Sequence, residues 1–314
     1  MSSILASHSI SSKSEKSSLA RNHSEKTSPL GLVIVSLTVV AMAGLLVWQF
    51  RNTLFLLPTI WQKDAATSHG WFILPLSVWF AVLASRRSSF RWNVHEEDSL
   101  QDCIAGSIRI LVGCFIHYGC LITHTGFFDL LALLLIVSGI TIMLIGKEKY
   151  RPFSFPLFFL MFASPWPSLV IDRLAIAMQQ AASWSGATLL DMMGIDVYRE
   201  GYRIMMPGFV MEVGAACSGL RQITAIFALS LAMGYLTRQS RSKMILLALL
   251  AVPIAIGANV IRILMTGLIL LFFGQKWAEG VYHSLEGMAI YAIAALLLWF
   301  VFWLIEKNSY AANE

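Results

Sequence analysis

Apolar stretches of about twenty residues, the length that crosses a bilayer, alternate with short polar joints along most of this chain. The membrane interior offers no water to hydrogen-bond a backbone, so such stretches form helices. The pattern predicts an all-α fold, a polytopic transmembrane helical bundle of about eight spans. The predicted spans are residues 31–50, 70–85, 103–122, 127–146, 153–171, 216–236, 243–273 and 284–305.

Polar residues set the limits of the predicted domain. Residues 1–29 are rich in serine, with lysine, glutamate and histidine interspersed, which is typical of a disordered tail. Residues 30–307 are predicted to form a single transmembrane domain, and residues 308–314 a short C-terminal tail. Between the first two spans, residues 51–68 are predicted to be a loop whose apolar patch, residues 54–61, lies on the membrane surface.

The fifth predicted span is irregular, because Pro156, Pro165 and Pro167 interrupt it. Proline removes a backbone donor from a helix, which predicts a break near the membrane interface at residues 164–167. In residues 172–193 polar and apolar side chains alternate at helical spacing, which predicts an amphipathic helix on or near the membrane.

A short non-helical segment is predicted next. Gly194 is expected to end the amphipathic helix. Residues 197–213 are predicted to be an extended segment or hairpin, with Pro207-Gly208 as its turn.

Charge sets the orientation of the predicted spans. Hydrophobic residues make up 57% of the chain and charged residues 13%, about half the charged share of a soluble domain. The mean hydropathy is +0.69. Lys and Arg cluster in the joints 86–91, 147–151 and 238–243, so the net charge of +5 gives no reason to expect nucleic-acid binding. The positive-inside rule puts these joints and both termini in the cytoplasm.

The four cysteines do not form a metal or redox motif. Cys103, Cys114 and Cys120 lie in or beside one apolar segment and are expected to be small buried hydrophobes. His8 and His23 lie in the tail, and the other histidines are scattered. The sequence predicts no metal and no cofactor.

Cys217 differs from the other cysteines in its surroundings. Ser218, Gly219 and other small residues flank it where a helix is expected to begin, and a helix N-terminus lowers the pKa of a thiol. Arg221 is four residues on and would share a helix face with Cys217. Arg221 there lowers the thiol pKa, or contacts substrate, or anchors the span at the interface.

Helix geometry brings Cys217, Arg262 and His283 to one depth. With a rise of about 1.5 Å per residue, they lie about 30, 28 and 34 Å from the cytoplasmic ends of three consecutive spans. Consecutive spans usually pack as neighbours, so the three side chains are expected to meet at the outer face. Asn259 shares a helix face with Arg262, and both polar groups are costly in an apolar span unless they serve a site.

Such a set suits nucleophilic acyl transfer. The thiolate of Cys217 attacks a peptide carbonyl, His283 accepts and returns the proton, and Arg262 stabilises the oxyanion or orients a carboxylate. Taken singly, the three residues have simpler interpretations: an inert buried thiol, an arginine that reaches for headgroups, and a solvated histidine in a loop.

Three motifs follow one another: Ala216-Cys217-Ser218-Gly219-Leu220-Arg221, Asn259-Val260-Ile261-Arg262, and His283 followed by Gly287. Together they resemble the exosortase/archaeosortase family, over roughly residues 153–302, the expected catalytic part. The resemblance implies a cysteine transpeptidase of the bacterial inner membrane whose catalytic residues are Cys217, Arg262 and His283, with its site facing the periplasm.

The resemblance also implies the partners. The substrates would be membrane proteins with a C-terminal sorting signal of the PEP-CTERM type: a short motif, a transmembrane helix and a basic cluster. The acceptor would be an amine, on a lipid or a glycan. A histidine at the third catalytic position is similar to bacterial members of the family. Because the chain ends soon after the eighth predicted span, the periplasmic C-terminal domain of some bacterial members is expected to be absent.

Two other functions stay open at this point. With water as the acceptor, the same site makes a cysteine protease. A transporter or polysaccharide-export scaffold would instead use Arg262 and Asn259 to line a substrate path and would not need the thiol.

Overall fold

The computed structural model describes residues 29–63, 67–88, 100–123, 126–165, 167–214, 219–278 and 281–311. All but the last residue of the predicted tail therefore lies outside the described part. The chain divides into two compact units, residues 1–51 and 52–314. In the first unit, α2 (Pro29–Gln49) is an apolar helix whose described side chains are mostly exposed, as a helix that faces lipid requires.

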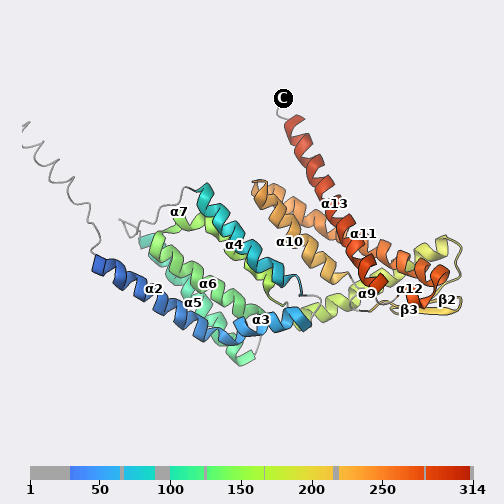
Figure 1. Ribbon diagram of the computed structural model, residues 1–314, viewed down its shortest axis with the longest axis horizontal. Helices are drawn as coiled ribbons and strands as arrows, with labels where there is room; N and C mark the ends of the chain where they lie inside the picture. The colour runs from blue at the N-terminus through green and yellow to red at the C-terminus, as the bar shows by residue number, and fades with distance from the viewer. Residues whose placement is uncertain are drawn as a thin grey trace, which may run out of the picture. The chain divides into compact units, whose positions relative to one another are not determined.

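The second unit consists of helices and one small sheet (Figure 1). The longer helices are α3 (Arg51–Lys63), which begins at the boundary between the units, α4 (Gly70–Arg87), α5 (Leu100–Thr123), α6 (Gly126–Ile145), α9 (Ser168–Met192), α10 (Leu220–Leu236), α11 (Arg241–Phe273) and α13 (Val281–Ala311). The shorter ones are α7 (Lys147–Tyr150), η1 (Arg151–Phe153), α8 (Ser154–Phe159), η2 (Leu160–Ala163) and α12 (Gln275–Ala278).

Four helices in the described part of the chain are long and apolar enough to cross a membrane. They are α5, α6, α11 and α13, and the count rises to five if residues 36–49 and 51–63 together make one interrupted span. The apolar part of α10, Gln222–Leu236, is shorter than a full span. The prediction of an all-α polytopic membrane protein is confirmed, whereas the count of about eight spans stays a prediction.

Helix α3 shows that the predicted loop at residues 51–68 is wrong over most of its length. Leu57 and Trp61 of α3 are buried in a core cluster with residues of α4, α8, η2 and α10. The indole N–H of Trp61 donates a hydrogen bond to the carbonyl of Ala163 (2.8 Å), and its ring meets Trp71 edge-on. The apolar patch is covered by protein because helical spacing puts Leu57 and Trp61 on one face.

The proline-rich segment contains no continuous helix over residues 153–171, which corrects the predicted fifth span. Three short helices, η1, α8 and η2, precede Ser164, whose backbone is extended, and α9 starts at Ser168. The predicted break at residues 164–167 is thereby confirmed. His69 Nε2 donates to the carbonyl of Phe162 (3.0 Å), so side chains from elsewhere satisfy carbonyls that the break leaves without helical partners.

The helix and hairpin predicted after this break are both confirmed. Helix α9 ends at Met192, and Gly194 follows with a φ of +82°. The strands β1 (Tyr198–Glu200), β2 (Arg203–Met206) and β3 (Phe209–Glu212) form an antiparallel sheet in the order β1-β2-β3, with Pro207-Gly208 as the turn between β2 and β3. Ile204, which pairs with Met211, is fully buried in a cluster shared with α9 and α11.

Candidate active site

Helix α11 is the centre of the candidate site, because α9, α10 and α13 each pack against it. A buried cluster joins Ile226 of α10, Ala255 and Ala258 of α11, and Ile290 and Ala294 of α13. Helices α10, α11 and α13 are therefore neighbours, as predicted for the three consecutive spans of the candidate site.

The far ends of these helices are tied together away from the candidate residues. The guanidinium of Arg87, at the end of α4, donates to the carbonyl of Leu236 at the end of α10 (3.1 Å). Gln239 Nε2 donates to Glu306 Oε1 near the end of α13 (3.4 Å). Basic residues gather at this end: Arg86, Arg87, Arg238, Arg241, Lys243 and Lys307. Helix α11 starts here, so Arg262 lies about 32 Å along it, near the opposite face of a bilayer.

Cys217 and Ser218 lie outside the described residues, but the chain on either side is fixed against α11. Val213, four residues before Cys217, is buried in the cluster that contains Ile263. Its backbone N–H donates to the carbonyl of Tyr202 (3.0 Å). Gly219, two residues after Cys217, contacts Asn259. Gly219 therefore lies against the turn of α11 that leads to Arg262, and Val213 belongs to the same buried cluster as Ile263, the residue after Arg262.

Gly219 starts α10 in a conformation that glycine tolerates best, with a φ of +85°. A Cβ at this position would lie 2.7 Å from the side-chain Cγ of Asn259, which is buried. Helix α10 begins at Leu220; the predicted helix face shared by Cys217 and Arg221 involves Cys217, which lies outside the described residues. Arg221 lies in the first turn of α10, and its side chain is outside the described part.

Arg262 is half-buried on α11 and faces the start of α13. A Cβ at Gly287 would lie 3.9 Å from the guanidinium carbon of Arg262, which is van der Waals distance, so the Arg262 side chain lies beside Gly287. His283 lies one turn before Gly287, in the first turn of α13, and not in a loop as expected; its side chain is outside the described part.

The sequence analysis missed Glu286 and Thr266, which link α13 to α11 beside Arg262. The Thr266 hydroxyl is 2.8 and 3.0 Å from the two carboxylate oxygens of Glu286 and 3.0 Å from the carbonyl of Arg262. The spacing was the available signal, because Thr266 follows Arg262 by four residues and Glu286 follows His283 by three, each one helical turn.

Gln222 is a second residue that the sequence analysis missed. It is buried in the first turns of α10, and its amide nitrogen Nε2 has no hydrogen-bond partner among the described residues. A buried amide donor without a partner costs about 1–3 kcal/mol, which makes Gln222 a candidate to bind a ligand oxygen.

The structure thus gathers Gly219, Asn259 and Arg262 directly, and it brings the backbone of His283 within one turn of Gly287. Such a set, with a thiol, an imidazole and a guanidinium, contains the groups that acyl transfer needs. Among the described residues, no group of three or more His, Cys, Asp or Glu side chains could hold a metal ion.

The comparison with protein families shows to which family the chain belongs. A family described as transmembrane exosortase matches residues 61–300. The chain belongs to the exosortase family. The match spans α4 to most of α13 and so includes all candidate residues of this exosortase. No curated protein and no solved structure matches it.

Proposed function

We propose that this exosortase is a membrane cysteine transpeptidase that cleaves a C-terminal sorting signal of exported proteins. Its substrates carry a short motif, a transmembrane helix and a basic cluster. One observation supports the proposal together with the family match: Gly219, two residues after Cys217, lies against Asn259 of α11, and Arg262 of the same helix lies beside Gly287, one turn after His283.

The reaction proceeds in two steps. In the first, the Cys217 thiol gives its proton to His283 and attacks the carbonyl before the scissile bond, and Arg262 and Gln222 donate to the oxyanion. His283 then protonates the leaving amine as the C–N bond breaks, which leaves a thioester on Cys217. In the second step an acceptor amine attacks the thioester, His283 takes its proton, and the thiolate leaves.

We further propose that the site opens on the outer face of a bacterial inner membrane, with about eight spans and both termini in the cytoplasm. The basic end formed by Arg87, Arg238 and Lys243 supports this orientation, because Lys and Arg favour the cytoplasmic side. Arg262 lies about 32 Å along α11 from that end, which is one hydrocarbon thickness away.

The test is the intact mass of a co-expressed protein that carries such a signal, with the native enzyme and with Cys217→Ala. We expect the tail to be lost only with the native enzyme. An added acceptor mass on the product identifies transfer, whereas a free carboxylate identifies hydrolysis and makes the protein a protease. If Cys217→Ala processes the substrate normally, the thiol is not the nucleophile and the proposal is wrong.

A control distinguishes a lost nucleophile from a lost fold. Cys120→Ala removes a buried thiol far from the site in sequence, and we expect this variant to process the substrate at the native rate. If neither variant nor the native enzyme processes any substrate with such a signal, while Arg262→Ala blocks the flux of an exported polymer, the scaffold function is the correct one.

A further inference from the structure

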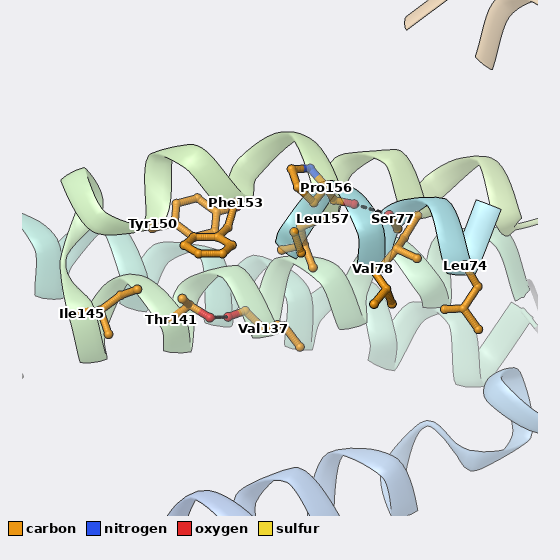
Figure 2. Close-up of a pocket in the computed structure, with 12 residues that line it drawn as sticks. Leu74, Ser77, Val78, Val137, Thr141, Ile145, Tyr150, Phe153, Pro156 and Leu157 are labelled. Carbon is orange, nitrogen blue, oxygen red and sulfur yellow. Dashed lines mark hydrogen bonds between the residues drawn. The ribbon is translucent and has the colours of Figure 1, made fainter. Parts of the chain in front are cut away.

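A cavity outside the candidate active site lies between α4, α6 and the run of short helices from α7 to η2. Its volume is about 310 Å³. In Figure 2, Val137, Thr141 and Ile145 follow one another along α6, with Tyr150 and Phe153 opposite. Toward the other end, the lining consists of Leu74, Ser77, Val78, Pro156, Leu157 and Leu160, with Ala81 of α4 completing it.

Of the three polar side chains in the lining, two donate hydrogen bonds within the protein. Ser77 Oγ donates to the carbonyl of Pro156 (2.5 Å), and Thr141 Oγ1 donates to the carbonyl of Val137 (2.7 Å). The Tyr150 hydroxyl lies close to the side chain of Ser138. The other nine lining residues are apolar. Such a lining favours a hydrocarbon occupant, which in a membrane protein comes from a lipid acyl chain.

The end of the cavity at Tyr150 is positively charged. Lys147, Lys149 and Arg151 surround Tyr150 in the sequence, and Glu148 is the one acidic residue of that stretch. Lys147 and Arg151 are exposed, so their charges are available to a ligand. Burial raises the pKa of the Tyr150 phenol, although the nearby Arg109 charge opposes the shift. The phenol therefore stays neutral and adds no negative charge to this basic end.

We propose that this cavity binds one acyl chain of an anionic phospholipid, whose phosphate lies against Lys147 and Arg151. The apolar lining favours an acyl chain, and the basic residues at the Tyr150 end favour a lipid whose headgroup is negatively charged. Such a lipid would hold α4 and α6 together on the side of the molecule where α4 also carries Arg86 and Arg87. The proposal does not depend on the chemistry of the candidate active site.

The test uses the full chain in phosphatidylcholine vesicles that contain one fifth phosphatidylglycerol. Either lipid in turn carries a photoactivatable diazirine on its acyl chain, and mass spectrometry locates the labelled peptides. We expect phosphatidylglycerol to label residues 74–81 and 137–160 more strongly than phosphatidylcholine does. Equal labelling by both lipids, or labelling spread evenly over all lipid-facing helices, overturns the proposal.

Paired variants test the two halves of the site separately. Lys147→Gln with Arg151→Gln should lower labelling by phosphatidylglycerol about fivefold or more, since each basic residue adds attraction for an anionic lipid. Arg241→Gln with Lys243→Gln removes the same charge at the start of α11 and should change nothing. An equal loss in both pairs means that surface charge alone attracts the lipid, which contradicts a specific site.

Filling the cavity tests the acyl chain. Val137→Phe should abolish labelling of residues 137–160 by either lipid, whereas Leu144→Phe, on an exposed position of the same helix outside the cavity, should not. Thermal unfolding reports whether each variant folds. If Val137→Phe does not fold, the charge variants still decide the question, and native labelling of the filled protein contradicts the proposal.

Discussion

Glycine brings helices together in two regions of this exosortase, and it meets different atoms in each. Between α5 and α6 it meets backbone: a Cβ at Gly139 would lie 2.6 Å from the carbonyl oxygen of Gly106, and a Cβ at Gly113 would lie 2.9 Å from that of Ala132. Between α10, α11 and α13 it meets polar side chains, because Gly219 faces Asn259 and Gly287 faces Arg262.

The difference distinguishes the α5/α6 pair, which is held by helix packing, from the candidate active site around α11. In lipid, small residues let helix backbones approach closely, and the α5/α6 pair uses them for packing alone. The one buried polar cluster described there is closed: Asp129 accepts from Thr53 and pairs with His117 (2.5 Å). At α11 the absent side chain of Gly219 leaves room for the Asn259 amide, and Gly287 lies beside the Arg262 guanidinium. The Gln222 Nε2 donor at the start of α10 has no partner among the described residues.

The largest difference between the two regions is expected when one arginine in each is replaced by lysine. Arg262→Lys should lower the rate of signal processing by about 100-fold or more, because a lysine loses the forked donors that stabilise an oxyanion. Arg109→Lys on α5 should leave the rate within about twofold, since the hydrogen bond that the described residues give Arg109 runs to the carbonyl of Ala105 in its own helix. Processing rates by intact mass, scaled to the folded fraction, check both; a similar loss in both variants would remove the distinction.

The polar cluster of the packed pair should matter for stability alone. Asp129→Ala removes the acceptor of Thr53 and His117 and should lower the free energy of unfolding by about 3 kcal/mol, with processing per folded molecule unchanged. Asp102→Ala, whose carboxylate accepts from the backbone of Lys147 (3.3 Å) near the surface, should cost less than about 1 kcal/mol. Thermal unfolding in detergent measures both. A loss of processing in folded Asp129→Ala would extend the site to α5 and α6.

Alanine at the glycines should separate stability from activity. Gly139→Ala forces a Cβ against backbone and should destabilise the protein by about 1–3 kcal/mol, without changing processing by the folded enzyme. Gly219→Ala adds the strain of a positive φ, about 1–2 kcal/mol, and displaces Asn259, so processing per folded molecule should also fall about tenfold. Gly257→Ala is the control, because a Cβ there contacts nothing within 4 Å. Full activity in folded Gly219→Ala would contradict a role for this contact in the site.

The smallest effect is expected at the link between α11 and α13. Thr266→Val should lower stability by about 1 kcal/mol and processing a few-fold, because Glu286 loses its donor and α13 is held less firmly beside Arg262. Thr188→Val is the matched control, since Thr188 also donates to a carbonyl four residues back (2.9 Å) but has no carboxylate partner in the described part. If a double-mutant cycle with Glu286→Gln finds no coupling, the link does not position α13.

The helices at α5, α6, α11 and α13 could be predicted because a long apolar stretch leaves the chain only one way to satisfy its backbone in lipid. The rise of a helix predicted that Arg262 would lie level with the start of the last span, and in the structure Arg262 lies beside Gly287 in the second turn of α13. The prediction failed at α3. The charged Arg51 and Lys63 and the helix-breaking Pro58 argued for a loop, but the segment is a helix that buries Leu57 and Trp61.

Contacts between distant segments could not be predicted from one sequence. The hydrogen bond from Trp61 to Ala163 and the bond between Thr266 and Glu286 depend on how helices settle against each other. Side-chain spacing shows that such residues share a turn with a candidate residue, but it does not identify the partner across the interface. For the same reason the left-handed start of α10 at Gly219 was missed, because it depends on the position of Asn259.

The most direct test of the central claim is to capture the covalent intermediate. The native enzyme is mixed with a peptide substrate, quenched with acid and digested, and mass spectrometry locates the adduct. The account predicts a hydroxylamine-sensitive thioester on the peptide that contains Cys217, and none on Cys103, Cys114 or Cys120. A substrate that is cleaved while Cys217 stays unmodified, with the adduct on another residue, would contradict it.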